Sequence, residues 1–237
     1  MNTDNLEQGI AFLAQNGLNL WGVLDCARIP ESARELFSPE INPSAYSRLI
    51  VLGNTGAQLW KFLQARGMDR SDPIDSASLD LAKRFCESYL PRGKHTVVFP
   101  TDYVVPLQRV GAILGWGEPS PLGIGIHPER GLWWAYRSAI MTSIDVPVTT
   151  VVDASSPCDQ CKSRACENAC PAGAVNVEAS FNVDACFRSR ALKNSICRDR
   201  CHARLACPVG NEYRYPMAMH NYIYKNSMKT VLNYVRD

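Results

Sequence analysis

Eight of the ten cysteines in this 237-residue chain fall within residues 158–207, and their spacing constrains the fold more than any other feature. The first four follow the pattern C-x2-C-x4-C-x3-C-P, and the second four also end in a Cys-Pro pair. Cys26 and Cys86 stand apart in apolar surroundings, so we expect them to be small buried hydrophobic side chains. The eight clustered residues are Cys158, Cys161, Cys166, Cys170, Cys186, Cys197, Cys201 and Cys207.

This spacing predicts two [4Fe–4S] clusters. Bacterial two-cluster ferredoxins have the pattern C-x2-C-x2-C-x3-C-P, in which the cysteine before proline ligates the other cluster. The present chain lengthens the middle spacer and stretches the second block. If the same exchange applies, one cluster takes Cys158, Cys161, Cys166 and Cys207, and the other takes Cys170, Cys186, Cys197 and Cys201.

Disulfides and structural zinc are the alternative uses of these cysteines. A disulfide scaffold is disfavoured because the chain is long enough to bury a core and its N-terminal sequence has no secretory pattern. Structural zinc suits C-x2-C pairs but does not require two Cys-Pro endings. His202 and His220 lie near the cysteines in sequence, yet we expect surface or hydrogen-bonded core histidines rather than ligands.

The remainder of the chain predicts an α+β protein with a layered first domain. Helical and strand patterns are mixed before residue 155, and the composition changes at 155–158. We therefore expect an α+β cofactor-binding domain at 1–155 and a bacterial-ferredoxin-like two-cluster module with a C-terminal tail at 156–237. Expected helices are 6–16, 55–67, 75–90 and 104–116; expected strands are 18–26, 47–54, 95–100 and 146–153, with a hairpin formed by 122–126 and 132–141.

Composition and charge narrow the function classes. There is no run of about 20 apolar residues and no signal peptide, so we expect a cytoplasmic protein without membrane contact. The absence of a G-x-G-x-x-G fingerprint argues against a Rossmann site. From residue 188 onward ten Lys/Arg face three Asp/Glu, a local balance of +7 in a chain of net charge +2. This basic end suits nucleic-acid phosphates or an acidic electron donor.

Five segments together resemble the epoxyqueuosine reductase family. They are TDYVVPLQRVGAILGWG (101–117), GLWWAYRSAIM (131–141), CDQCKSRACENACPAGAV (158–175), NVDAC (182–186) and CPVGN (207–211). Their order and spacing match the family from about residue 95 to 211. The stretch from Asp102 to Trp116 is the most discriminating piece, since many ferredoxin-like proteins share the cysteine pattern.

The resemblance implies a cobalamin-binding domain fused to a two-cluster module, and reduction of epoxyqueuosine to queuosine in tRNA. Asp102 would be the proton donor, with a pKa raised beside the low-dielectric corrin face. The alternative is that Asp102 caps a helix that begins at Val104 or Val105. Gly115, Trp116 and Gly117 match the segment beside the corrin, where glycine permits close backbone approach. Trp133 and Trp134 are expected to be core residues.

Two departures from the family leave alternatives open. Residues 117–120 read Gly-Glu-Pro-Ser where members have a basic continuation, and members carry a C-terminal helical-repeat domain beyond this length. A tRNA partner therefore stays open, while a low-potential electron donor of flavodoxin or ferredoxin type is expected. The alternatives are an electron-transfer or corrinoid-reducing protein without its own tRNA substrate, and a flavin-dependent small-molecule reductase of the same architecture.

Overall fold

The computed structural model describes residues 3–151 and 155–236, and the chain divides into two compact units. The first unit comprises residues 1–115 and 134–153, and the second comprises 116–133 and 154–237. Residues 116–133, which the sequence assigned to the first domain, therefore belong to the second unit. The second boundary, between 153 and 154, lies close to the expected change at 155.

The first unit is built on a four-stranded antiparallel sheet in the order β1-β2-β4-β3. The central strand β2 is a nearly continuous apolar run, which is typical of a strand covered on both faces. A bulge interrupts its pairing with β4 between Leu52 and Gly53. The strands are β1 (Leu20–Asp25), β2 (Arg48–Thr55), β3 (His95–Phe99) and β4 (Trp134–Thr142).

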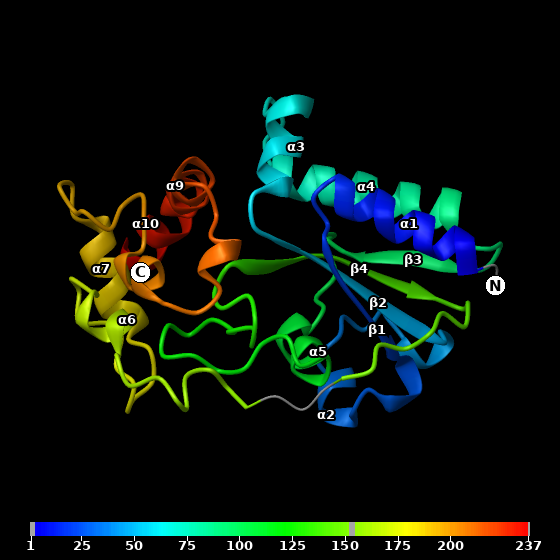
Figure 1. Cartoon of the computed structure of the whole chain (residues 1–237), viewed down its shortest axis with the longest axis horizontal. Coiled ribbons are helices and arrows are strands. Elements are labelled where there is room, and N and C mark those ends of the chain that lie inside the picture. Colours follow the sequence, from blue (N-terminus) through cyan, green and yellow to red (C-terminus); the bar gives the residue numbers. More distant parts are fainter. Residues whose placement is uncertain (1–2, 152–154, 237) are drawn as a thin grey trace. The chain divides into compact units, whose positions relative to one another are not determined.

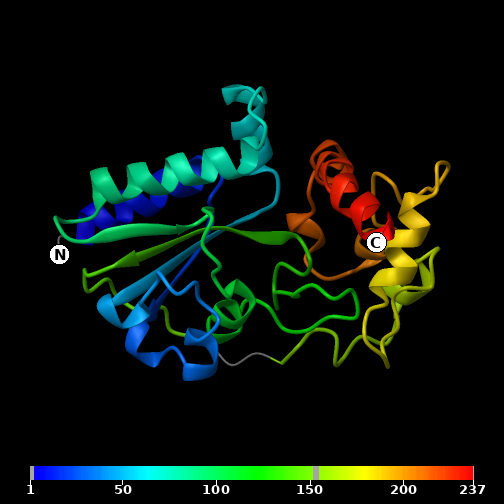
Figure 2. The same cartoon turned by 180° about the vertical axis from the view of Figure 1, so that it is seen from behind.

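Helices cover both faces of this sheet (Figures 1 and 2). The long helices α1 and α4 lie side by side on one face, and α2 and α5 lie on the other. The 3₁₀ turns η1 (Cys26–Arg28) and η2 (Pro43–Ala45) complete this unit. Its helices are α1 (Thr3–Gln15), α2 (Glu31–Arg34), α3 (Gln58–Arg66), α4 (Pro73–Tyr89) and α5 (Leu107–Ile113).

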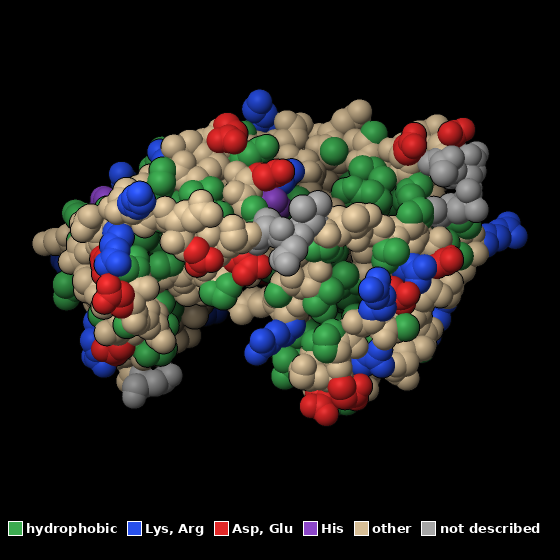
Figure 3. Space-filling view, turned by 60° about the horizontal axis from the view of Figure 1, so that its bottom comes forward, with side chains coloured by type: hydrophobic (Ala, Val, Ile, Leu, Met, Phe, Trp, Pro, Cys, Tyr) green, Lys and Arg blue, Asp and Glu red, His purple; other side chains and the backbone are tan. Residues whose placement is uncertain are grey.

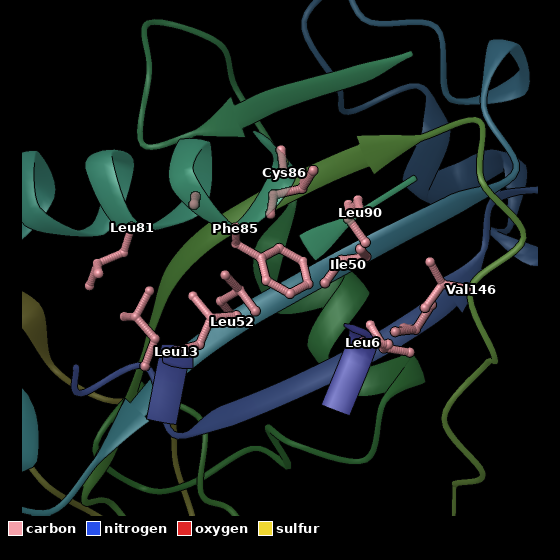
Figure 4. Packing of buried hydrophobic residues seen from close by; sticks show 13 residues of the cluster. Leu6, Leu13, Ile50, Leu52, Leu81, Phe85, Cys86, Leu90 and Val146 are labelled. Carbon is pink, nitrogen blue, oxygen red and sulfur yellow. The ribbon is translucent and has the colours of Figure 1, made fainter. Parts of the chain in front are cut away.

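The core of the first unit lies between the two long helices and the sheet. Phe85 of α4 packs with Ile50 and Leu52 of β2 and with Leu13 of α1 (Figure 4). Fully burying a side chain of this size stabilises the fold by about 1.5–3 kcal/mol. Gly9 lets the helices approach, since a Cβ there would lie 2.6 Å from Cε2 of Phe85.

Three sequence predictions for this unit need correction. The hairpin is wrong, because β4 pairs with β2 and β3, whereas Ile126 forms an isolated bridge with Glu118. The strand at 146–153 is also wrong over 146–151, and 152–153 lie outside the described residues. There the backbone N–H of Thr149 donates to the carbonyl of Val23, but the N–H of Val23 donates to the Thr149 hydroxyl instead of a carbonyl, so the two segments form no regular ladder.

The helix expected at 104–116 is shorter than predicted. The preceding residues are tied in an extended arrangement, since Val104 exchanges hydrogen bonds with Ser38 through its N–H and its carbonyl. Helix α5 therefore begins after Pro106 and ends before Gly115, whose φ of 69° suits glycine after a helix. Helix α4 begins at Pro73, two residues earlier than expected.

The second unit consists of short helices joined by loops that carry the cysteines. Helix α7 packs against α10, and α6 packs against α8. Residues 171–176 form turns and irregular backbone and contain no strand. The elements are α6 (Ala165–Asn168), α7 (Val183–Ala191), α8 (His202–Ala206), η3 (Asn211–Tyr213), α9 (Met217–Asn226) and α10 (Met228–Arg236).

Residues 116–133 join this unit through very close backbone contacts. A Cβ on Gly131 would collide with the carbonyl of Val209, and one on Gly210 would collide with the backbone of Arg130. Both glycines have positive φ, 57° and 68°.

None of the helices in the described parts of the chain is long and apolar enough to cross a membrane.

Candidate iron–sulfur site

The first group of cysteines comprises Cys158, Cys161, Cys166 and Cys207. A turn holds the first pair, with the backbone N–H of Cys161 donating to the carbonyl of Cys158 at 3.1 Å. Cys166 lies in α6 and Cys207 directly follows α8. Burial raises the pKa of the Cys158 thiol, and the neighbouring thiols of Cys207, Cys166 and Cys161 raise it further. The four sulfur atoms are thus electrostatic neighbours.

The second group comprises Cys170, Cys186, Cys197 and Cys201. Burial raises the pKa of Cys186 to about 11, and the thiols of Cys201, Cys170 and Cys197 add to this rise. Cys186 projects from α7, while Cys201 is the N-cap of α8, where its Sγ accepts from a backbone N–H. Helices α7 and α8 therefore fix two members of this group.

Seven of the eight cysteines line one of two cavities. A cavity of about 760 Å³ is lined by Cys158, Cys161 and Cys166. A smaller one of about 170 Å³ is lined by all four cysteines of the second group and by apolar side chains that include Leu122 and Phe181. Apolar packing around thiolates limits water access, a factor that sets cluster potentials.

The grouping crosses the two sequence blocks. Cys207 ends the second block but lies with Cys158, and Cys170 ends the first block but lies with Cys186. Both crossing cysteines precede proline, in Cys170-Pro171 and Cys207-Pro208. This arrangement has the same connectivity as the exchange in two-cluster ferredoxins.

Helix α9 supplies two side chains that contact Cys201. The backbone N–H of Cys201 donates to Nε2 of His220 at 3.1 Å, and the Tyr224 hydroxyl hydrogen-bonds the Cys201 thiol. The two rings lie one helical turn apart and are tilted against each other, with centroids 4.6 Å apart. Burial raises the pKa of Tyr224, so its hydroxyl stays a donor.

Two buried arginines accompany the cysteines. Arg190 donates to the carbonyls of Cys197 and Tyr224, at 3.2 and 2.9 Å. Arg204 donates to the carbonyl of Leu132 and lies over the ring of Trp133, 5.0 Å from its centroid. Such buried cations offset negative charge on nearby thiolates.

These contact residues were not predicted as parts of the site. His220 was expected to be a surface or core-satisfied histidine; it is fully buried, and one of its two ring nitrogens is used. The spacing of His220 and Tyr224, four residues apart on one helix, is the signal in the sequence that could have indicated a shared contact. His202 is hydrogen-bonded to the carbonyl of Ile196.

The expected catalytic acid, Asp102, lies in the exposed loop before α5. Its carboxylate makes no hydrogen bond with any described residue. The capping alternative is wrong, because α5 begins at Leu107 and no side chain caps it. The loop is held by Thr101, whose hydroxyl donates to the carbonyl of Val98 and accepts from the N–H of Tyr103.

The expected corrin-contact segment contains one buried aromatic residue. Trp116 is buried, whereas Gly115 and Gly117 are partly exposed. Trp133 and Trp134 are buried, which confirms their prediction as core residues. Cys26 and Cys86 are buried too, and burial raises the pKa of each to about 11.

Residues 3–151 and 155–236 form no site for a single metal ion. No three or more His, Cys, Asp or Glu side chains there are arranged to hold one metal ion.

Known proteins resemble this chain in structure and not in sequence. No protein-family model matches the sequence, and no curated protein matches it. Epoxyqueuosine reductase from Streptococcus thermophilus matches 91% of this chain and 68% of that chain, with a TM-score of 0.56 and 14% identity. The enzyme from Bacillus subtilis has the same coverage, with a TM-score of 0.55 and 14% identity.

Reductive dehalogenases are also similar to this chain in structure. The catabolic reductive dehalogenase NpRdhA matches 93% of this chain and 34% of that chain, with a TM-score of 0.53 and 14% identity. The chain shares its fold with both groups of reductases. At this level of identity the likeness concerns the fold alone.

Proposed function

We propose that this chain is an iron–sulfur oxidoreductase that holds two [4Fe–4S] clusters. The observation that carries the proposal is the sorting of eight cysteines into two groups of four, seven of which line one of two cavities. Four thiolates are the ligand set of a [4Fe–4S] cluster, so the residues present fit the group. The likeness to two groups of reductases supports an oxidoreductase.

When bound, the clusters supply one-electron redox chemistry. The chain's own residues hold the sulfur ligands and exclude water. Leu122 and Val175 belong to a buried apolar cluster against which cysteines of both groups pack, and the N–H of Cys201 is directed to His220 rather than to solvent. Arg190 and Arg204 place positive charge inside the unit, which favours the negatively charged, reduced state.

We propose further that the electrons serve a bound cobalamin and an epoxyqueuosine-type substrate. One of the similar dehalogenase structures is described as suggesting B12-dependent dehalogenation, and one epoxyqueuosine reductase structure contains an epoxyqueuosine-modified tRNA stem loop. The Bacillus subtilis enzyme has an aspartate-bearing catalytic loop that is swung out of the active site in its structure.

Asp102 is the proposed proton donor of this chain. Its exposed carboxylate, with no hydrogen-bond partner among the described residues, is available to a substrate. The carboxyl would supply a proton from its oxygen to the substrate. The positive φ of Gly115 and the lack of a side chain at Gly117 permit close approach of a flat cofactor.

The experiment begins with anaerobic purification and titration with cob(II)alamin. A changed corrin spectrum at saturation supports the cofactor, whereas an unchanged spectrum overturns it. Turnover of a tRNA stem loop containing epoxyqueuosine then tests the substrate, with Asp102→Asn expected to lose activity while it keeps iron and cobalamin. Iron without cobalamin binding or turnover would instead identify a protein that only carries electrons.

A further inference from the structure

The segment between α7 and α8 displays two aliphatic side chains beside the second cysteine group. Leu192 is 64% exposed and Ile196 is 61% exposed. Ile196 directly precedes Cys197, which is buried and lines the smaller cavity. Single exposed aliphatic residues are common on protein surfaces, so the surroundings of this pair decide their meaning. We call residues 192–197 the 192–197 loop.

The 192–197 loop is held in one conformation by hydrogen bonds. The guanidinium of Arg198 donates to the carbonyls of Ala191 and Leu192, both at 3.2 Å. The carbonyl of Ile196 is hydrogen-bonded to the His202 ring at 3.2 Å. A fixed loop loses little conformational entropy when a partner binds, which favours docking.

The loop carries positive charge beside its aliphatic pair. Of the six Lys/Arg residues between 186 and 204, Arg190 and Arg204 are buried, Arg188 pairs with Asp184 and Arg200 pairs with Asp199. Lys193 and Arg198 are the remaining cations beside the loop. Lys193 is exposed and forms no ion pair with any described residue. On the face shown in Figure 3, acidic and basic side chains are interspersed. The loop therefore presents an apolar pair beside the positive charges of Lys193 and Arg198, which is complementary to an acidic surface.

The composition of the loop favours a protein over a nucleic acid. Proteins that bind single-stranded nucleic acids use aromatic side chains on which the bases stack. The 192–197 loop reads Leu-Lys-Asn-Ser-Ile-Cys and offers aliphatic side chains instead. Aliphatic contacts within a charged rim are typical of protein–protein interfaces.

We propose that the 192–197 loop is the docking surface for a small acidic one-electron carrier protein, and that electrons enter the chain at the second cysteine group. This inference rests on the two clusters of the proposed function. In the step the carrier is oxidised by one electron and the cluster held by Cys197 is reduced by one electron. No covalent bond forms or breaks.

The test measures how fast a reduced acidic [2Fe–2S] ferredoxin reduces the anaerobic, cluster-loaded chain in a stopped-flow instrument. Lys193→Glu is expected to lower the second-order rate constant about tenfold at low salt and to weaken its salt dependence. Leu192→Ser with Ile196→Ser is expected to slow the reaction at every salt concentration. Reduction by dithionite should be unchanged in the variants, because it needs no docking surface.

The matched control is Lys162→Glu, an exposed charge reversal beside Cys161 of the first group. It should leave the rate with ferredoxin unchanged. The proposal is overturned if Lys162→Glu slows the reaction while Lys193→Glu does not, or if ferredoxin fails to reduce a chain that dithionite reduces. It is also overturned if Lys193→Glu weakens binding of a tRNA stem loop but not reduction by ferredoxin.

Failure of the proposed function is recognised separately. A chain that lacks about eight irons and shows no cluster absorption fails before any kinetic experiment. If the double serine variant does not retain iron, Lys193→Glu alone decides the question, since this exposed side chain makes no ion pair within the described residues.

Discussion

The backbone N–H of Cys201 donates to Nε2 of His220 across 3.1 Å, from the N-cap of α8 to the middle of α9. Because Nε2 accepts, the neutral ring carries its proton on Nδ1. Burial, followed by the charges of Arg204 and Arg200, lowers the pKa of His220 to about 4, so the ring is neutral at pH 7. A neutral histidine thereby anchors the loop that carries a proposed cluster ligand.

Removing this anchor should destabilise the second unit. His220→Leu leaves the buried N–H of Cys201 without its acceptor, which costs about 1–3 kcal/mol. His220→Gln retains an acceptor and should lose less. The check is the urea unfolding midpoint of the anaerobic protein, together with its iron content. Equal midpoints for the two variants would contradict a role for the hydrogen bond.

The hydroxyl of Tyr224 should raise the potential of the cluster bound by Cys201. Hydrogen bonds to ligand sulfurs stabilise the reduced state of a cluster. Tyr224→Phe removes about 1 kcal/mol of such stabilisation, which corresponds to a potential lower by about 40 mV for one electron. A redox titration followed by electron paramagnetic resonance measures the shift. Tyr234→Phe, an exposed residue of α10, is the control and should leave both potentials unchanged.

The exchange of Cys170 and Cys207 between the two sequence blocks predicts the iron content of variants that lack two cysteines. The wild-type chain should hold about eight irons, and Cys170→Ala should hold about four. Adding Cys186→Ala should remove no further iron, because both residues serve one cluster. Adding Cys158→Ala should instead remove nearly all of it. The reverse pattern would mean that each cluster uses one sequence block, and Cys86→Ala serves as the control that keeps about eight irons.

The buried His127 should make the second unit less stable in acid. Its Nδ1 accepts from the backbone N–H groups of Glu129 and Arg130, at 3.1 and 3.3 Å. Burial, followed by the charge of Arg130, lowers the pKa of His127 from 6.5 to about 4. The unfolded chain therefore binds a proton that the folded chain does not, so this stabilising contribution is complete above pH 6.5 and falls as the pH drops towards 4.

His127→Asn isolates this contribution. The Asn oxygen can accept from the N–H two residues later and does not titrate. Between about pH 7 and pH 5 the unfolding temperature of the wild type should fall more steeply than that of the variant. Parallel pH profiles would show that His127 makes no contribution in this window.

In the first unit, Gly111→Ala should disturb the packing between α5 and β4. A Cβ at this position would overlap the hydroxyl of Tyr136, a partly buried residue of β4. Overpacking of this kind costs about 1–3 kcal/mol. Tyr136→Phe removes the overlapping oxygen, so the double variant should recover part of the loss. The measurement is thermal unfolding of the wild type, the two single variants and the double variant. A double variant that is no more stable than Gly111→Ala would contradict the predicted overlap with the Tyr136 hydroxyl.

Several elements were predictable because their signals are local. The apolar runs of β1, β2 and β3, and the periodic patterns of α1 and α4, lie within single segments, and the structure confirms them within a few residues. The hairpin failed because β4 pairs with strands far away in sequence, on both of its edges. The shortened α5 depends on Ser38, 66 residues from Val104, which no local pattern reveals.

The sequence by itself determined the eight cysteines, their Cys-Pro endings and the expectation of two four-thiolate sites, since ligand spacing is a property of the chain. Only the tertiary structure decided that residues 116–133 pack with the cysteine-bearing unit and that α9 brings His220 and Tyr224 to Cys201. These contacts join segments that are widely separated in the chain. They form because backbone N–H groups that are buried away from water need hydrogen-bond partners within the fold.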